Sequence, residues 1–296
     1  MFVKSAVIIA AAVFLAAARA SAAERGTSAR FTLWQLPEQT HSQMMSYVLQ
    51  TGSGTVIVID GGTKGDAPYL RGFLKNLGGK VEAWVLTHPH SDHCHAMAEI
   101  LSNPDGISVK RLYASLPPDE WLRAHEPDSA RDAAAVREAA RSAGLAFNQM
   151  VPGQLLVFDG VRVEVLGVRN EEIRANAINN SSVVLRASDA RKSVLFTGDL
   201  GPEGGEKLLK SRMASRLRAD YVQMAHHGQN GVTEEFYRAV QPSYCLWTTP
   251  TWLWNNDRGQ GPGTGPWRTL EVRGWMEKHS IEKHFVTSID GLVRID

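Results

Sequence analysis

The chain has 296 residues, with 32 Lys and Arg against 31 Asp and Glu, so its formal net charge is +1 at pH 7. This balance argues against a protein that binds long duplex DNA or coats an acidic membrane, because both need a strong positive field. Its two cysteines, Cys94 and Cys245, are too few for a disulfide framework, and we expect both to be free and buried.

The first 23 residues have the composition of a secretory signal peptide. Lys4 supplies a positive start, an apolar run follows it, and small residues at positions 18–22 offer cleavage sites. The run is short for a transmembrane span, although an uncleaved membrane anchor is the alternative. No later segment is long and apolar enough for stable membrane insertion. We therefore expect a periplasmic or extracellular protein, in which residues 24–296 form one domain.

Strand and helix signals are mixed along the rest of the chain, which predicts an α/β domain. The predicted strands are residues 30–36, 44–51, 55–60, 81–86, 109–113, 154–158, 161–166, 182–186, 193–197, 219–224 and 244–247. The predicted helices are residues 66–77, 96–101, 128–143 and 268–278. Asp159-Gly160 signals a hairpin, and a closing hairpin is predicted at residues 283–296 around Asp290-Gly291.

Candidate metal ligands are densest in V-L-T-H-P-H-S-D-H-C-H, residues 85–95. Four of them fall within six positions: His88, His90, Asp92 and His93. They follow a predicted buried strand and precede a predicted helix that Asp92 is expected to cap, so their side chains can converge on one point. Neutral imidazoles with one carboxylate suit zinc or a similar divalent ion, manganese included. The stretch therefore predicts a site for one or two divalent ions.

These residues match the signature H-x-H-x-D-H, and the chain here resembles the metallo-β-lactamase-fold hydrolase superfamily. The resemblance implies a four-layer αββα sandwich, with two sheets backed by helices on both outer faces. Later motifs follow in order: N-N-S-S, then T-G-D at residues 197–199, then A-H-H-G at residues 225–228. Together they resemble the hydrolase domain of bacterial competence-type DNA-uptake channel proteins, over residues 31–249.

The resemblance also implies a ligand set for two ions that share one carboxylate: His88 and His90 for the first, Asp92, His93 and a late histidine for the second, and Asp199 between them. Asp60 is implied to accept a hydrogen bond beside the metal-binding turn, with a simple turn-forming role as the alternative. Two such ions would lower the pKa of a shared water toward about 7 and provide a metal-bound hydroxide as the nucleophile.

The late histidine is His226 or His227, and the sequence does not separate them. His226 is favoured as the ligand because it directly continues a predicted strand. His227, together with Asp92, is then the catalytic candidate and would face the substrate or leaving group, although a loop residue without a role is the alternative.

The first ion lacks a third histidine, because the segment where one is expected, residues 176–182, reads N-A-I-N-N-S-S. We expect one of Asn176, Asn179 and Asn180 to occupy the position of the missing histidine. Of the three, Asn180 is predicted to support the metal ligands. Asparagine is a weak, neutral ligand, so the first site is expected to be the looser one. His95 is the alternative occupant of the missing position.

Tryptophans gather around a Gly- and Pro-rich loop at residues 248–266. This loop is either a lid that forms a substrate wall or a loop held in place by core tryptophans. The candidate wall residues are Trp252, Trp254, Arg258 and Trp267. The leading hypothesis is a secreted metal-dependent hydrolase acting on a small or short single-stranded phosphodiester. The alternatives are an acyl hydrolase of a lactam, lactone or thioester, and a non-catalytic, metal-stabilised binding protein.

Overall fold

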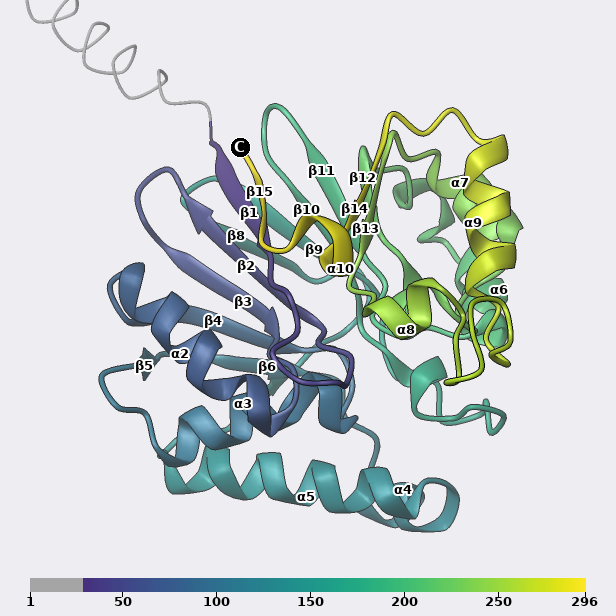
Figure 1. Ribbon diagram of the computed structural model, residues 1–296. Coiled ribbons are helices and arrows are strands. Elements are labelled where there is room, and N and C mark those ends of the chain that lie inside the picture. The colour runs from purple at the N-terminus through teal and green to yellow at the C-terminus, as the bar shows by residue number, and fades with distance from the viewer. Residues whose placement is uncertain (1–28) are drawn as a thin grey trace, which may run out of the picture.

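The computed structural model describes residues 29–296 (Figure 1), so the predicted signal peptide at residues 1–23 lies outside the described part. Within residues 29–296, no helix has the length and apolar character needed to cross a membrane. Both cysteines of the chain, Cys94 and Cys245, are free and buried, as predicted.

Two β-sheets form the centre of the molecule. Sheet A has the strand order β15-β1-β2-β3-β4-β6-β7, with β5 paired to β4. Its strands are β1 (Phe31–Gln35), β2 (Ser46–Thr51), β3 (Val56–Asp60), β4 (Lys80–Leu86), β5 (Ser108–Val109), β6 (Leu112–Ala114), β7 (Phe147–Gln149) and β15 (Val293–Ile295).

Sheet B has the order β14-β13-β12-β11-β10-β9-β8. Its strands are β8 (Leu155–Phe158), β9 (Val161–Gly167), β10 (Val184–Ser188), β11 (Ser193–Phe196), β12 (Tyr221–Gln223), β13 (Tyr244–Trp247) and β14 (Lys283–Val286). The hairpin predicted at Asp159-Gly160 is confirmed by the antiparallel pair β8–β9.

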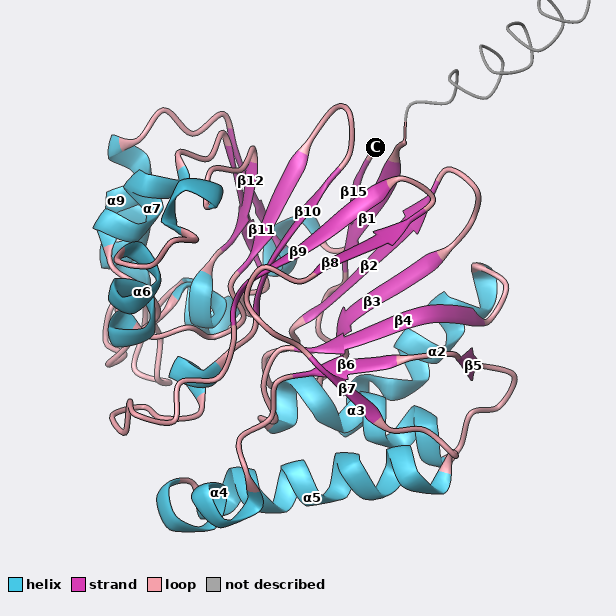
Figure 2. Cartoon of the chain, turned by 180° about the vertical axis from the view of Figure 1, so that it is seen from behind, coloured by secondary structure: helices cyan, strands magenta, loops and turns pink. Residues whose placement is uncertain are grey.

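Helices cover the outer face of each sheet (Figure 2). Those beside sheet A are α2 (Ala67–Asn76), α3 (Ser91–Ser102), α4 (Asp119–His125) and α5 (Pro127–Ser142). Those beside sheet B are α6 (Pro202–Leu209), α7 (Glu234–Val240) and α9 (Thr269–Lys278). The order helix, sheet, sheet, helix confirms the predicted αββα sandwich.

Three large apolar cores hold these layers together, and β3 shows why a strand between them is apolar up to its last residue, Asp60. Ile57 and Ile59 point into the core between the two sheets. Val56 and Val58 point the other way, into the core under α2, α3 and α5. Since successive side chains of a strand alternate between faces, a strand covered on both faces has to be apolar at every position.

The polar residues of the ligand motifs lie where strands of the two sheets end. Strand β3 runs parallel to β4 in sheet A, and β11 runs parallel to β12 in sheet B. The carboxyl ends of parallel neighbouring strands lie at the same edge of a sheet. The residues after β4 therefore emerge beside the end of β3 in sheet A, and those after β11 emerge beside the end of β12 in sheet B. The fold therefore collects side chains that are more than 100 residues apart in sequence.

The predicted closing hairpin is wrong. Strand β14 lies parallel to β13 in sheet B, whereas β15 lies beside β1 in sheet A. The short helix α10 (Thr287–Asp290) carries the chain from one sheet to the other, and Asp290 accepts a hydrogen bond from the amide of Val286. A turn-forming sequence predicts that the chain changes direction, but it does not predict which strand the next strand pairs with.

Other differences concern element boundaries. Helix α3 begins at Ser91, so Asp92 lies inside its first turn and His90 takes the capping position. The strand predicted at residues 109–113 is divided into β5 and β6. Helices α4, α6 and α7 were not predicted; each has only seven or eight residues, too few for a clear helical period.

Candidate metal centre

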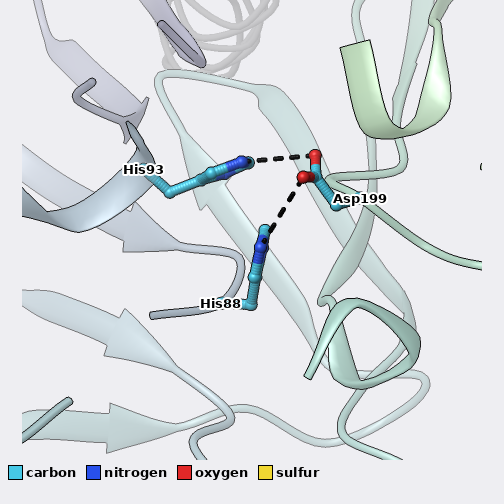
Figure 3. Close-up of side chains that lie close together, drawn as sticks. All are labelled: His88, His93 and Asp199. Atoms are coloured by element: carbon cyan, nitrogen blue, oxygen red, sulfur yellow. Dashed lines mark ion pairs between the residues drawn. The ribbon is translucent and has the colours of Figure 1, made fainter. Parts of the chain in front are cut away.

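Seven acidic and imidazole side chains converge where strands of the two sheets end: His88, His90, Asp92, His93, Asp199, His226 and His227. Two groups have ligand atoms that all lie within 4.8 Å of one another: His88, His93 and Asp199 in one, and Asp92, His93 and His227 in the other. Figure 3 shows the first group, with both imidazoles pointing at the carboxylate of Asp199.

The distances are those of groups that face a common point. Asp199 Oδ1 lies 3.2 Å from His93 Nε2, and its Oδ2 lies 3.8 Å from His88 Nε2. His88 Nε2 is also 3.0 Å from Nδ1 of His90. The structure thus brings together all four residues of the H-x-H-x-D-H motif, since Asp92 Oδ2 lies 3.2 Å from His227 Nε2.

Asp60, at the end of β3, orients one of the imidazoles. Its Oδ2 accepts a hydrogen bond from His93 Nδ1 at 2.8 Å, and the amide and hydroxyl of Thr87 also donate to it. Because a carboxylate only accepts, Nδ1 of His93 carries the proton that is donated to Asp60, and its Nε2 points toward Asp199. Asp60 therefore has the position that the resemblance implied for it.

A glycine permits the close approach of the strand ends. Gly198 has φ 54°, and a Cβ there would lie 2.9 Å from Ser182 Oγ and 3.0 Å from Thr87 Cβ. Its carbonyl accepts a hydrogen bond from the amide of His226, which ties the turn η4 (Ala225–Gly228) to the segment carrying Asp199. Only glycine fits both the backbone angle and the contact.

The atoms that point inward have no partner of their own. Within the described residues, His93 Nε2, Asp199 Oδ1 and His227 Nε2 are buried and make no hydrogen bond. An unpaired buried polar atom costs about 1–3 kcal/mol, so three of them around one point call for a group that pairs with all three. The donor set, imidazole nitrogens with carboxylates, fits a divalent cation such as zinc.

The charges in this cluster also favour a cation. Burial alone would raise the pKa of Asp199, but the imidazoles of His93 and His227 outweigh it and hold that pKa well below its ordinary value. Burial likewise acts to raise the pKa of Asp92, yet the neighbouring imidazoles of His227 and His93 lower it to about 2. Both carboxylates are therefore ionised at neutral pH, which is the form that binds metal.

The two adjacent histidines are placed differently from the expectation. His227 is fully buried, its Nδ1 donates to the carbonyl of Thr248 at 2.8 Å, and its Nε2 faces Asp92. His226 is 19% exposed at its side chain, with Nε2 3.7 Å from Asp199 Oδ2. The group formed with Asp92 and His93 contains His227 and not His226, which the sequence analysis favoured as the ligand. Both residues have left-handed φ angles (52° and 54°), so neither continues the strand as the prediction assumed.

Asn180, the predicted supporting residue, does not reach the cluster. Its side chain is buried beneath α6, where Oδ1 accepts from the amide of Gly204 and Nδ2 donates to Glu203 and to the carbonyl of Ala175. It therefore anchors the first turn of a helix. The sequence could not show this, because the segment supplies three asparagines and only packing decides which of them faces the site.

Asn179 is the asparagine that faces the cluster. Its Nδ2 donates to Asn176 Oδ1 and lies 3.5 Å from His226 Nε2, and its Oδ1 is buried without a partner. His95, the alternative for the missing histidine, points away from the cluster and pairs with Asp132 of α5 at 2.8 Å. Residues 176–182 therefore place an amide, and no imidazole, beside the cluster.

The predicted substrate wall is only partly assembled. The rings of Trp252, in the one-turn helix α8 (Thr251–Trp254), and Trp267 are in contact, with centroids 4.7 Å apart. Trp254 instead is partly buried and packs edge-on against the fully buried Trp247, a member of the core of sheet B. Arg258 is exposed, and no contact joins it to these rings in the described part of the chain.

Comparison with curated proteins supports the motif assignment. ComE operon protein 3 of Bacillus subtilis is 31% identical over 173 residues, which are 56% of this chain and 20% of that protein. Recombination protein 2 of Haemophilus influenzae is 26% identical over 140 residues, 47% of this chain and 16% of that protein. The chain thus spans a fifth or less of the length of these relatives. They confirm the predicted resemblance to competence-type proteins.

Solved structures and a family model establish the fold. The metallo-β-lactamase fold protein YhfI from Bacillus subtilis aligns with a TM-score of 0.54 at 10% identity, over 90% of this chain and 100% of that one. A mutant of the CmlA β-hydroxylase gives 0.52 at 13% identity, over 90% and 54%. The model described as "Metallo-beta-lactamase superfamily" matches residues 41–242. The chain therefore belongs to the metallo-β-lactamase superfamily, whose members are generally metal-dependent hydrolases.

Proposed function

We propose that this protein is a metal-dependent hydrolase that cleaves a small or short single-stranded phosphodiester. The observation that carries the hydrolase assignment is the set of buried, unpartnered atoms that face one point: His93 Nε2, His227 Nε2 and Asp199 Oδ1. The narrower substrate class is supported by the competence-type relatives named above and by the paired rings of Trp252 and Trp267.

The ligand roles follow from which atoms face each other. His88 Nε2 and His90 Nδ1 would hold one ion, and Asp92, His93 and His227 the other. Asp199 would bridge them, since its two oxygens face His93 and His88 separately. Bound divalent ions, zinc or manganese, supply Lewis acidity to activate water and to polarise the scissile group.

Two residues keep the imidazoles ready to bind. Asp60 holds the proton of His93 on Nδ1, and the carbonyl of Thr248 does the same for His227. Both rings are thereby fixed in the tautomer whose Nε2 is free to act as a ligand. Neither ring has to reorganise when an ion binds, which favours tight coordination.

His226 is the histidine that remains for the substrate. It is the most open imidazole next to Asp199, and its Nε2 lies beside the amide of Asn179. These two groups would bind an oxygen of the substrate and hold the proton that the leaving group takes, a role the sequence analysis gave to His227. Asn179 would contribute an amide donor where related enzymes place a histidine.

The substrate is proposed to be short because a net charge of +1 gives little attraction for the many phosphates of long duplex DNA. The paired rings of Trp252 and Trp267 offer a flat aromatic surface, and stacking of a base on such a surface is worth about 1–3 kcal/mol. The indole of Trp252 donates to the carbonyl of His41, which fixes its orientation.

The test is a substrate panel on purified protein with added zinc or manganese. We expect bis(p-nitrophenyl) phosphate and short single-stranded oligonucleotides to be hydrolysed faster than a cephalosporin, a lactone or a thioester. Asp199→Asn should remove turnover of every substrate while the circular dichroism spectrum is unchanged. Faster cleavage of the lactam or lactone would replace this proposal with an acyl hydrolase. A panel with no turnover at all would favour a binding protein.

We also propose that the protein is exported, on the composition of residues 1–23 alone. Fusing these residues to alkaline phosphatase, which is active only after export, tests this directly. Replacing the apolar run of the fusion by one with two added lysines is the matched control and should abolish activity. Equal activity of the two fusions would contradict export by this segment.

A further inference from the structure

A cavity that is separate from the metal cluster lies between sheet B and α6. It has a volume of about 260 Å³. Its apolar walls come from β9, β10 and α6, through Leu166, Val184 and Leu208. All three are buried members of the core between sheet B and its covering helices, which stand together on that face in Figure 2. The cavity therefore penetrates the outer layer of the fold.

The charged side chains that line this cavity are all positive: Arg169, Lys207 and Arg212. Arg169 already pairs with Glu171, and Lys207 pairs with Glu172. Arg212 forms no ion pair within residues 29–296, and it is exposed. An apolar cavity with an unpaired guanidinium at its rim suits a ligand with a hydrocarbon body and an anionic end.

Arg212 and Met213 lie close to the turn before β8. A Cβ on Gly153 would lie 3.9 Å from Arg212 Nη2 and 3.4 Å from Met213 Cε. The guanidinium and the thioether thus come together at one place on the rim. Met213 is half-buried and lines the cavity, so a larger side chain there would close it without disturbing the sheet.

The inner end of the cavity stops short of the metal ligands. Ser182 is fully buried and lines the cavity, and its hydroxyl lies 3.3 Å from His88 Nδ1 and accepts from the amide of Asp199. One side chain thus stands between the cavity and the ligand residues. A molecule bound in the cavity would occupy a site distinct from that of the hydrolysed substrate.

We propose that this cavity binds a small amphiphilic anion, a single alkyl chain that ends in a carboxylate. The chain would lie among Leu166, Val184 and Leu208, where its burial removes apolar surface from water. The carboxylate would pair with the guanidinium of Arg212, which binds such a group through two parallel hydrogen bonds. No covalent step takes place there, and the inference does not depend on which bond the metal site cleaves.

Calorimetric titration of the full chain with octanoate tests the proposal. We expect saturable binding of one octanoate per chain. Arg212→Gln should weaken it about tenfold, because a hydrogen-bonded charge pair is lost. Arg218→Gln is the matched control, since Arg218 is exposed on the same connection between α6 and β12 but does not line the cavity, and it should bind octanoate as wild type does.

Two further measurements distinguish binding in the cavity from non-specific adsorption of octanoate. Met213→Trp should abolish binding while the thermal unfolding curve remains cooperative. Octan-1-ol, which has the chain but no charge, should bind about tenfold more weakly than octanoate, and Arg212→Gln should not weaken it further. The proposal is overturned if octanoate does not saturate, if octan-1-ol binds as tightly, or if the Arg212 and Arg218 variants behave alike.

Discussion

His226 and His227 are neighbours in sequence, yet they differ in burial and in what they face, and this gives a direct test of the ligand assignment. His227→Ala should lose one of two bound ions, because His227 Nε2 faces Asp92 inside the cluster. His226→Ala should keep both ions and slow turnover by roughly 10²-fold, the effect of losing an acid or a substrate contact. Metal analysis after dialysis distinguishes them, and the reverse result would return the ligand role to His226.

Asp60 should matter for metal affinity rather than for folding. Asp60→Asn replaces the charged acceptor for His93 Nδ1 by an amide, so the ring is less firmly held. Loss of such a partner typically weakens metal binding 10–100-fold. Asp159→Asn is the matched control, because Asp159 has a similar left-handed backbone (φ 49° against 56°) but bonds to Thr51, far from the cluster. Equal zinc affinity in the two variants, by competition with a chelating dye, would argue against this role.

Asp189, in the turn between β10 and β11, should make stability depend on pH. Burial acts to raise its pKa, but hydrogen bonds from the amides of Arg191, Lys192 and Phe31 outweigh this and lower it. A carboxyl whose folded pKa is lowered contributes stability that is complete above its unfolded pKa, about 4, and disappears as the pH falls through the folded value.

Asp189→Asn should therefore lower the free energy of unfolding by about 1.5–3 kcal/mol at pH 7, the range for a hydrogen-bonded charged group. The difference from wild type should shrink below about pH 4. Urea unfolding at several pH values measures it, with Asp128→Asn, an exposed aspartate of α5, as the control. A difference that stays constant down to pH 2 would show that the charge is not responsible.

At the scale of elements, the turn η4 depends on a glycine that packs against a strand. Gly228 has φ 80°, and a Cβ there would lie 2.3 Å from the ring of Trp247 in β13. Gly228→Ala should destabilise the protein by at least about 1–2 kcal/mol, because a left-handed backbone and a collision are combined. It should also reduce metal content, since the turn carries His227.

Gly72→Ala is the contrasting change. Gly72 lies inside α2 with open space where its Cβ would stand, so alanine should stabilise the protein by about 0.5–1 kcal/mol. Thermal unfolding measures both variants. If both glycines responded alike, neither the contact with Trp247 nor the backbone angle would explain the need for glycine at position 228.

At the scale of the whole molecule, the metal centre and the three apolar cores are separate. The ligands sit at the edge of the sandwich, whereas the layers are joined by Val, Ile, Leu and aromatic side chains. Removing the ions with a chelator should abolish hydrolysis while the far-ultraviolet circular dichroism remains. The loss of bound ligand should still lower the unfolding temperature, and zinc should restore it in a concentration-dependent way. Unfolding on chelation at room temperature would contradict this separation.

The sequence by itself determined what depends on neighbouring residues. The spacing of His88, His90, Asp92 and His93 located the metal-binding turn, and the apolar run before Asp60 located a strand covered on both faces. Asp159-Gly160 gave the hairpin β8–β9, because that dipeptide readily adopts the positive φ angles found there, 49° and 83°. Helices α2, α5 and α9 were predicted within one residue at each end, since each has at least ten residues of regular pattern.

Only the tertiary structure decided what depends on long-range packing. It brought His227 rather than His226 within 4.8 Å of other possible ligand atoms through a left-handed turn, and it left Asn179 rather than Asn180 facing the cluster because α6 covers the latter. It placed β14 and β15 in different sheets, and it packed Trp254 against the core of sheet B. In each case the deciding contact comes from an element elsewhere in the chain, which no local pattern records.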